Sequence, residues 1–408
     1  MVTSAGTEVP VRAYKEPRSI PGASGSSKQI AAVKGDFQGS DGMMTPNHDD
    51  TAAGRIQGPD SGLLGLPADQ FRAELSSFLE ARSEPAYRAR QIAEWIFERG
   101  TASFDEMTSL PAGLRSTLRD TYSISPLTLA FEAKSRDGTV KHLWELHDGG
   151  QVESVLIPTR ERLTLCLSSQ AGCALGCRFC ATGYLGFQRQ LSPAEIVAQY
   201  RDSNNYAKTR FRRPITNVVF MGMGEPLANL DSVLVSLEVL HRSFGLGARR
   251  ITVSTVGLVP GILALARAPA AYELAVSLHA PTHELRLDLV PIEKRFPLEE
   301  LFRALRQYQE SKNRRISFEY TLIAGVNDDL ALADALADLA YGLTCFVNLI
   351  PFNPIPDRPE WKASRLAVAR RFARALEARE IQAAVRVPRG RDIAAACGQL
   401  RLERLAAG

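Results

Sequence analysis

Four of the six cysteines lie within fifteen residues, and Cys173, Cys177 and Cys180 have the spacing C-x3-C-x2-C. Cysteine thiolates bind zinc ions and iron–sulfur clusters. A structural zinc ion normally takes a fourth cysteine or histidine, and no histidine lies near these residues in the sequence. A [4Fe–4S] cluster accepts three thiolates from the protein and leaves one iron free for another ligand. The spacing favours such a cluster, with a zinc site or three buried thiols as the alternatives.

Three more motifs stand where predicted strands end, which is where α/β proteins of parallel strands gather their chemistry. The segment Gly222-Met223-Gly224-Glu225-Pro226 is a glycine-rich turn whose backbone can approach an amino-acid ligand closely. Taken alone, this turn is an ordinary strand-to-helix connection. Ser254-Thr255-Val256-Gly257 and Ser277-Leu278-His279-Ala280-Pro281 follow the next two strands, and His279 alone would be a core histidine. Their joint occurrence makes all three segments candidates for a ligand site.

Two motifs near the C-terminal end complete the set. Residues 349–354 read Leu-Ile-Pro-Phe-Asn-Pro after a predicted strand, and Cys397 stands between small residues in Ala396-Cys397-Gly398-Gln399-Leu400. Together the motifs closely resemble the RlmN/Cfr family of radical S-adenosylmethionine (radical-SAM) RNA adenine methyltransferases, with the RlmN branch the nearer of the two. The resemblance covers about residues 63–400 and includes the segments 104–107, 137–139, 152–155 and 389–393.

The resemblance implies two cofactors, a [4Fe–4S] cluster and S-adenosylmethionine (SAM). It assigns the cluster to the three closely spaced cysteines, Cys173, Cys177 and Cys180. The positions that match the family's SAM contacts are Gly224, Glu225, Ser254, Ser277, Leu278, His279 and Asn353.

The reaction that the resemblance implies is a radical one, because adenine carbons C2 and C8 are electron-poor and cannot simply displace the methyl group of SAM. Cys397 would first receive a methyl group from one SAM. A 5′-deoxyadenosyl radical from a second SAM would take hydrogen from that S-methyl group, and its carbon would join the base. Glu153 matches the family's proton acceptor, and Cys166 matches the thiol that releases the adduct by forming a disulfide with Cys397.

Each of these three residues also has a purely structural interpretation. Cys397 could be a buried small hydrophobic residue, Cys166 could simply pack within its strand, and Glu153 could face solvent. Cys345 belongs to no motif and is expected in the core.

The elements that position these residues alternate between strands and helices from residue 163 to about residue 388. Strands are expected at residues 163–167, 217–221, 250–254, 273–278, 316–323 and 345–350. Helices are expected to begin near Ser192, Asn229, Val259, Pro297, Asp329 and Glu360. Six strand–helix units predict an α/β fold, a partial (βα)6 radical-SAM barrel over residues 161–390. Residues 391–408 would form a C-terminal segment with the methyl-carrier cysteine.

Two regions precede the predicted strands of the barrel. Residues 1–60 contain 8 Gly, 5 Pro and 6 Ser without hydrophobic periodicity, which predicts a disordered extension. Residues 126–160 contain the hairpin signals Asp137-Gly138 and Asp148-Gly149-Gly150, which predict a small β linker.

Residues 61–125 predict an N-terminal helical module, because apolar residues recur there with helical periodicity. We expect this module to bind RNA. A second helix is expected to end at Gly100 and a third to span about 103–121. The arginines of this module are typical either of solvated helix faces or of a surface that contacts an RNA backbone. The first helix should bury one face that carries Phe71, Leu75, Phe78 and Leu79.

Composition excludes several classes of protein. The chain of 408 residues has 45% hydrophobic residues and a net charge of +4, which permits nucleic-acid binding without requiring it. No apolar run approaches the roughly 20 residues that cross a bilayer, and no secretory signal precedes the fold. We therefore expect a cytoplasmic, monomeric protein without a membrane partner.

The sequence predicts an enzyme that methylates C2 of a specific adenosine in 23S rRNA and in tRNA, reduced by a low-potential flavodoxin or ferredoxin. The alternatives are methylation at C8, which confers ribosomal antibiotic resistance, and a non-catalytic RNA-binding factor with an iron–sulfur cluster. Basic segments at residues 210–213, 249–250 and 386–391 suit phosphate contacts or solvated faces. Gln190 and Arg391 depart from the family pattern, and neither is expected to touch a chemical role.

Overall fold

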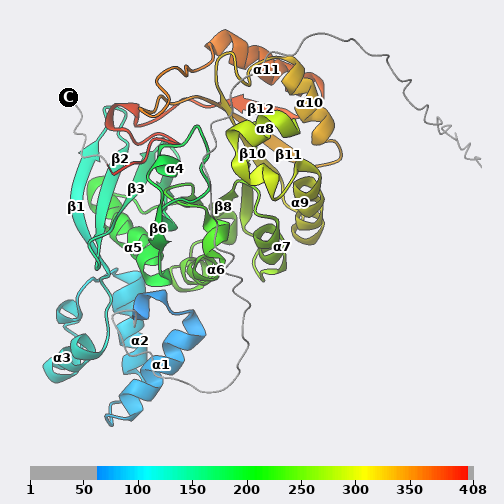
Figure 1. Cartoon of the computed structure of the whole chain (residues 1–408). Coiled ribbons are helices and arrows are strands. Elements are labelled where there is room, and N and C mark those ends of the chain that lie inside the picture. Colours follow the sequence, from blue (N-terminus) through cyan, green and yellow to red (C-terminus); the bar gives the residue numbers. More distant parts are fainter. Residues whose placement is uncertain (1–61, 403–408) are drawn as a thin grey trace, which may run out of the picture. The chain divides into compact units, whose positions relative to one another are not determined.

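A ten-stranded sheet runs through the part of the chain that the computed structural model describes, residues 62–402 (Figure 1). The strand order is β1-β2-β3-β4-β7-β8-β9-β10-β11-β12. The predicted disordered extension, residues 1–60, lies outside the described residues. From β4 onward all neighbouring strands are parallel: β4 (Leu163–Cys166), β7 (Asn217–Phe220), β8 (Ile251–Thr255), β9 (Glu273–Ser277), β10 (Ile316–Leu322), β11 (Cys345–Pro351) and β12 (Gln382–Val385).

The six predicted barrel strands are confirmed with ends that differ by one residue, and most of their side chains are buried, as in sheets covered on both faces. β12 is a seventh parallel strand that the sequence analysis missed. Its half-exposed pattern gives no apolar run, and it pairs only with β11. Because the sheet ends at β1 and β12 without closing, the described chain forms an open, partial barrel, as predicted.

Helices connect the parallel strands and lie around the sheet (Figure 1). They are α5 (Pro193–Arg210), α6 (Leu230–Glu238), α7 (Val259–Arg267), α8 (His283–Leu289), α9 (Leu298–Lys312), α10 (Ala331–Leu339) and α11 (Leu366–Ala378). None of the helices in residues 62–402 is long and apolar enough to cross a membrane.

The last of these helices begins at Leu366, so the prediction of a helix start near Glu360 is wrong. The residues directly before this helix form backbone hydrogen bonds with the end of β10 instead. Ala363 forms a bridge with Ile323, and the Ala324 N–H donates to the Lys362 carbonyl. Backbone that pairs with a strand end in this way cannot also close helical turns.

The predicted β linker is the antiparallel edge of the same sheet. β1 (Leu127–Lys134), β2 (Val140–Leu146) and β3 (Gln151–Pro158) pair in succession, and β3 pairs antiparallel with β4. Both predicted hairpin turns are confirmed. Gly138 and Gly149 have φ of 87° and 80°, the left-handed region that favours glycine. A second sheet, from β5 (Gln170–Gly172) and β6 (Phe187–Gln190), frames the cysteine loop.

The N-terminal module contains α1 (Ala68–Glu80), α2 (Arg88–Ala93) and α3 (Ala112–Thr121). The predicted apolar face of the first helix is confirmed, because Phe71, Leu75, Phe78 and Leu79 are all buried. A single third helix over 103–121 is wrong. A short 3-10 turn at Phe104–Glu106 is separated from α3 by Pro111, which stands at the helix start with an extended ψ of 144°.

Arg201 of α5 joins this module to the sheet. Its side chain is fully buried, and its guanidinium donates to the backbone carbonyls of Ile124 and Thr101 and pairs with Asp202. One turn further along α5, the Asn205 amide donates to the Gly100 carbonyl over 2.6 Å. Helix α5 therefore donates hydrogen bonds to backbone carbonyls in the middle and at the end of the module.

Replacing Arg201 with Met should loosen the module, because two buried carbonyls lose their donor. Each orphaned group costs about 1–3 kcal/mol, so we expect a loss of about 2–4 kcal/mol in the free energy of unfolding. Chemical denaturation would measure the loss, and limited proteolysis would show earlier cleavage near residues 122–126. Arg210→Met, at the exposed end of the same helix, is the matched control and should change stability by less than about 0.5 kcal/mol. Equal stability of the two variants would contradict this account.

Candidate active site

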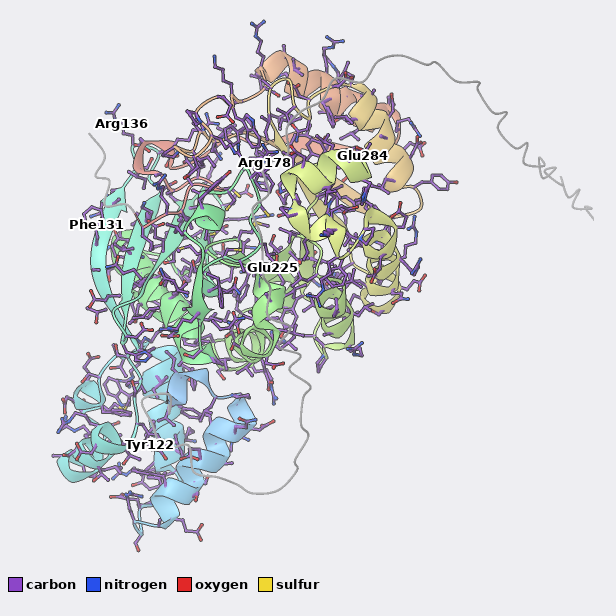
Figure 2. The ribbon with its side chains drawn as sticks, viewed as in Figure 1. Tyr122, Phe131, Arg136, Arg178, Glu225 and Glu284 are labelled. Atoms are coloured by element: carbon purple, nitrogen blue, oxygen red, sulfur yellow. The ribbon has the colours of Figure 1, made fainter. Side chains whose placement is uncertain are left out.

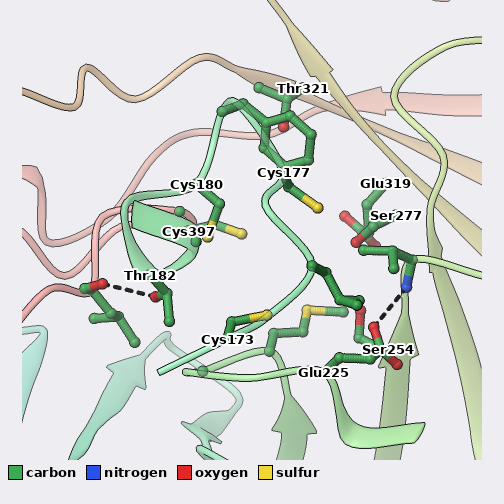
Figure 3. A pocket seen from close by; sticks show the side chains of 18 of the residues that line it. Cys173, Cys177, Cys180, Thr182, Glu225, Ser254, Ser277, Glu319, Thr321 and Cys397 are labelled. Atoms are coloured by element: carbon green, nitrogen blue, oxygen red, sulfur yellow. Dashed lines mark hydrogen bonds between the residues drawn. The ribbon is translucent and has the colours of Figure 1, made fainter. Parts of the chain in front are cut away.

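A cavity opens at the carboxyl ends of the parallel strands, and the three motif cysteines line it (Figure 3). They lie on the loop between β5 and α4 (Ala181–Tyr184). The loop is held by tight backbone contacts. The Cys173 N–H donates to the Gly186 carbonyl, and a Cβ on Gly172 would lie 1.8 Å from that same oxygen, so only glycine fits there. The β5–β6 hairpin thus fixes where the loop enters the cavity.

The cysteine thiols are protonated in this environment. Burial raises the pKa of Cys173 to about 11 and raises the pKa values of Cys177 and Cys180, with neighbouring thiols adding to the rise for Cys173 and Cys177. Iron bound at the thiols would reverse this preference, because the metal stabilises the thiolate. Within residues 62–402 no three His, Cys, Asp or Glu side chains converge closely enough to hold one metal ion. Three thiols spread along one cavity wall fit a cluster that takes one thiolate per iron.

Glu225 lies deep in the interior and lines the same cavity (Figures 2 and 3). Its carboxylate accepts hydrogen bonds from the backbone N–H groups of Leu227 and Val256, at 3.1 Å and 2.9 Å. Burial raises the pKa of this carboxyl to about 7, against the effect of those hydrogen bonds. Gly224, with φ of 95°, lets the backbone pass against the Gln170 side chain, where a Cβ would lie 2.5 Å from the nearest atom. The carboxyl can therefore gain or lose a proton near neutral pH beside the cysteine loop.

His279 offers a hydrogen-bond donor to the cavity. It has a left-handed φ of 59°, and its Nδ1 accepts a hydrogen bond from the Thr321 N–H at 3.0 Å. Burial lowers the pKa of the ring to about 3, so the imidazole is neutral. Because Nδ1 accepts, Nε2 carries the hydrogen, and it has no partner within the described protein. An unpaired buried donor at a cavity wall is the mark of a ligand contact.

Most of the remaining predicted SAM contacts also reach this cavity. Ser254, Ser277 and Asn353 line it, from the ends of β8, β9 and the segment after β11. Leu278 does not. Its side chain is fully buried in the core, and its backbone N–H donates to the Glu319 carbonyl.

Cys397 lines the cavity beside Cys180, on a segment that we call the C-terminal strap, residues 390–402 (Figure 3). Three hydrogen bonds place it. The Asn353 amide donates to the Cys397 carbonyl, the Ala181 N–H donates to the Gly398 carbonyl, and the Thr182 hydroxyl donates to the Leu400 carbonyl. The Cys397 side chain is solvent-exposed, unlike those of the other five cysteines, which are buried or half-buried. The strap thus brings a fourth thiol to the cavity that holds the other three.

Two predicted catalytic residues do not line the cavity. Glu153 is fully buried on β3, which excludes the solvent-facing interpretation, and pairs with Lys141 over 2.8 Å. Cys166 is buried on β4 beside Val219 of β7. The predicted disulfide between Cys166 and Cys397 is not formed, because all six cysteines are free. Cys345 is buried in the core, as expected.

Several residues of the site have no signal in the sequence. Gln170 accepts from the Glu225 N–H at 2.7 Å, and Glu319 and Thr321 line the cavity from β10. Gln190 and Arg391, which were expected to touch no chemical role, form hydrogen bonds close to the site. Gln190 accepts from the Gln170 amide, and Arg391 donates to the Asn353 amide oxygen at 2.7 Å. Of the two partners, Asn353 lines the cavity, and Gln170 accepts from the backbone of Glu225, which does.

The basic segments are partly used inside the protein. Arg386 donates to Asn348, and Arg213 donates to the carbonyls of Thr159 and Arg160. Arg249 and Arg250 are exposed at the start of β8. Arg249 and Arg250 therefore leave positive charge at the amino end of β8, whereas the cavity lies at its carboxyl end. Arg386 and Arg213 hold neighbouring segments of the chain in place.

Known proteins resemble this chain over most of its length. Residues 167–336 match the family model described as the Radical SAM superfamily, and residues 63–124 match the Ribosomal RNA large subunit methyltransferase N-terminal domain. A relative from Gemmatimonas aurantiaca, named probable dual-specificity RNA methyltransferase RlmN, is 47% identical over 345 residues, 84% of this chain and 94% of the relative. A dual-specificity RNA methyltransferase RlmN from Anaeromyxobacter sp. (strain Fw109-5) is 44% identical over 85% of this chain and 92% of its own.

A solved structure agrees with these matches. The crystal structure of a radical SAM methyltransferase from Sphaerobacter thermophilus superposes with a TM-score of 0.80 at 46% identity, over 84% of this chain and 99% of the other. The identity, the coverage and the two matching family models lead to one conclusion. The chain belongs to the RlmN family of radical-SAM methyltransferases, enzymes whose cofactors are a [4Fe–4S] cluster and SAM.

Proposed function

We propose that the protein methylates C2 of a specific adenosine in 23S rRNA and in tRNA, with Cys397 as the methyl carrier. The observation that carries the proposal is the position of Cys397, which faces the same cavity as Cys173, Cys177 and Cys180. The names of the relatives, dual-specificity RNA methyltransferases, support an RNA substrate of two kinds. A low-potential flavodoxin or ferredoxin would reduce the protein, which we expect to act as a monomer.

The bound cofactors would supply a 5′-deoxyadenosyl radical, which can activate a methyl group that simple displacement cannot transfer to an electron-poor ring carbon. The chain's own residues prepare for this chemistry. Cys173, Cys177 and Cys180 would hold the cluster. Glu225 and His279 present a carboxyl group and an N–H donor, which suit the amino and carboxylate groups of an amino-acid ligand.

Cys397 would hold the methyl group at the cavity wall, because the strap fixes its backbone by the hydrogen bonds described above. Glu153 would accept the proton that the ring carbon loses. The target adenosine must leave its stack to reach a cavity at the end of a sheet, and exposed arginines would hold the neighbouring phosphates.

Replacing Cys397 with Ala should abolish RNA methylation, by more than about 10³-fold, since no other thiol can carry the methyl group from this position. Cluster content and RNA affinity should stay unchanged. The assay is anaerobic turnover of the reconstituted protein with SAM, reductant and either 23S rRNA fragments or tRNA, followed by mass spectrometry of the nucleosides. Cys345→Ala, a buried cysteine outside the cavity, is the matched control and should stay active.

The products decide between the alternatives. 2-Methyladenosine from both RNAs supports the full proposal. 8-Methyladenosine would show that the protein methylates C8 instead of C2. A Cys397→Ala protein with full activity would contradict the carrier role. A wild-type protein that binds RNA and yields no methylated base would indicate the non-catalytic factor.

The pKa of Glu225, raised by burial to about 7, makes SAM binding dependent on pH. The ionised carboxylate is the form that attracts the SAM ammonium group, and it prevails only above that pKa. SAM affinity should therefore increase as pH rises through about 7, and fall below it. Equilibrium dialysis of the reconstituted protein measures this, and Glu225→Gln should bind weakly with no such dependence. A Glu225→Gln protein that keeps the wild-type pH dependence would rule this group out.

A further inference from the structure

A buried ion pair lies between the antiparallel edge of the sheet and the C-terminal strap. Lys141 of β2 and Glu153 of β3 are diagonal neighbours, since Lys141 is paired with Val155 and Glu153 with Leu143. The Lys141 Nζ lies 2.8 Å from Glu153 Oε1, and the two side chains are 1% and 0% exposed. Such complete burial of both charges is rare for lysine and glutamate. No motif of the sequence analysis included Lys141.

The strap lies against both members of this pair. The Leu402 N–H donates to Glu153 Oε2 at 3.2 Å, and Lys141 Nζ lies 3.5 Å from the Ala394 carbonyl. Residues 394 and 402 stand on either side of Cys397 in the strap. The pair is therefore fixed by the same segment that presents the methyl-carrier thiol to the cavity.

Burial favours the neutral form of Glu153. Loss of water favours the uncharged form and raises the pKa of this carboxyl. The groups that act in the opposite direction are the Lys141 ammonium on β2 and the backbone amides of Arg401 and Leu402 on the strap. Of these, only Lys141 carries a full charge. A neutral carboxylic acid cannot accept a proton, so the proposed role of Glu153 requires this partner.

We propose that Lys141 is a positioning residue, which keeps Glu153 ionised and oriented toward the strap so that it can accept the proton of the substrate base. The inference rests on the proposed function of Glu153 and adds the partner that makes it possible. It also gives a reason for burying a lysine, since replacing a buried ion pair by apolar residues is often neutral or stabilising for a fold.

The test compares Lys141→Met with Lys141→Arg in anaerobic single-turnover methylation of RNA across pH, using protein with a full cluster. Lys141→Met should lower the methylation rate near neutral pH by about 10²–10³-fold, the contribution of a general base. Its rate should recover roughly tenfold per pH unit as alkaline solution ionises Glu153. Lys141→Arg keeps a cation and should keep most of the rate and the wild-type pH profile.

Lys134→Met is the matched control, because Lys134 pairs with Glu132 over 2.7 Å at an exposed site on the neighbouring strand. It should leave rate and pH profile unchanged. A second measurement needs no turnover. The infrared spectrum of Lys141→Met minus that of Lys141→Met/Glu153→Gln should contain the carbonyl band of a protonated carboxylic acid. The spectrum of the wild type minus that of Glu153→Gln should lack this band.

Two outcomes would overturn the inference. One is a Lys141→Met protein with the wild-type rate and pH profile. The other is a rate loss that is uniform across pH, together with no acid band in the infrared spectrum, which would indicate a structural role only. Failure of the proposed function is distinguishable from both, because the wild-type protein would then produce no methylated adenosine.

Discussion

The backbone hydrogen bonds that fasten the C-terminal strap are the interactions on which the active site depends. The carbonyls of residues 397, 398 and 400 accept from Asn353, Ala181 and Thr182, respectively. Asn353 lies just after β11, and Ala181 and Thr182 directly follow the last cysteine of the loop. The neutral hydrogen bonds are each worth only about 0.5–1.5 kcal/mol, yet together they set where the carrier thiol lies. The cavity has all four thiols on its walls because the strap is hydrogen-bonded to Asn353 and to the residues after the cysteine loop.

The walls of the cavity follow the same rule that buried polar groups need partners. Glu225 satisfies two backbone N–H groups, and Asn327 joins the carbonyl of His279 to the end of β10. Arg286, fully buried, pairs with Glu293 and donates to the Val256 carbonyl, which ties α8 to the strand ends. The unpartnered Nε2 of His279 is thus conspicuous, and it is the kind of exception that a bound ligand explains.

Local patterns were enough to predict the strands, the hairpin turns and the cysteine loop, because each depends on neighbours close in sequence. Ten of the thirteen predicted site residues line one cavity, and Glu153, Cys166 and Leu278 do not. Contacts between distant segments were not predictable. No pattern around Lys141 predicts an ionic partner on β3. β12 lacks an apolar run because it is an edge strand that pairs only with β11. The broken third helix reflects Pro111, whose effect the apolar spacing concealed.

The strap follows the cysteine loop by a long stretch of chain, so it leaves the ribosome long after that loop has been made. Until it docks, the wall that carries Cys397 is missing and the three thiols stand open to the surroundings. The three cysteines of the loop are therefore made, and can begin to fold, before the wall that carries Cys397 exists.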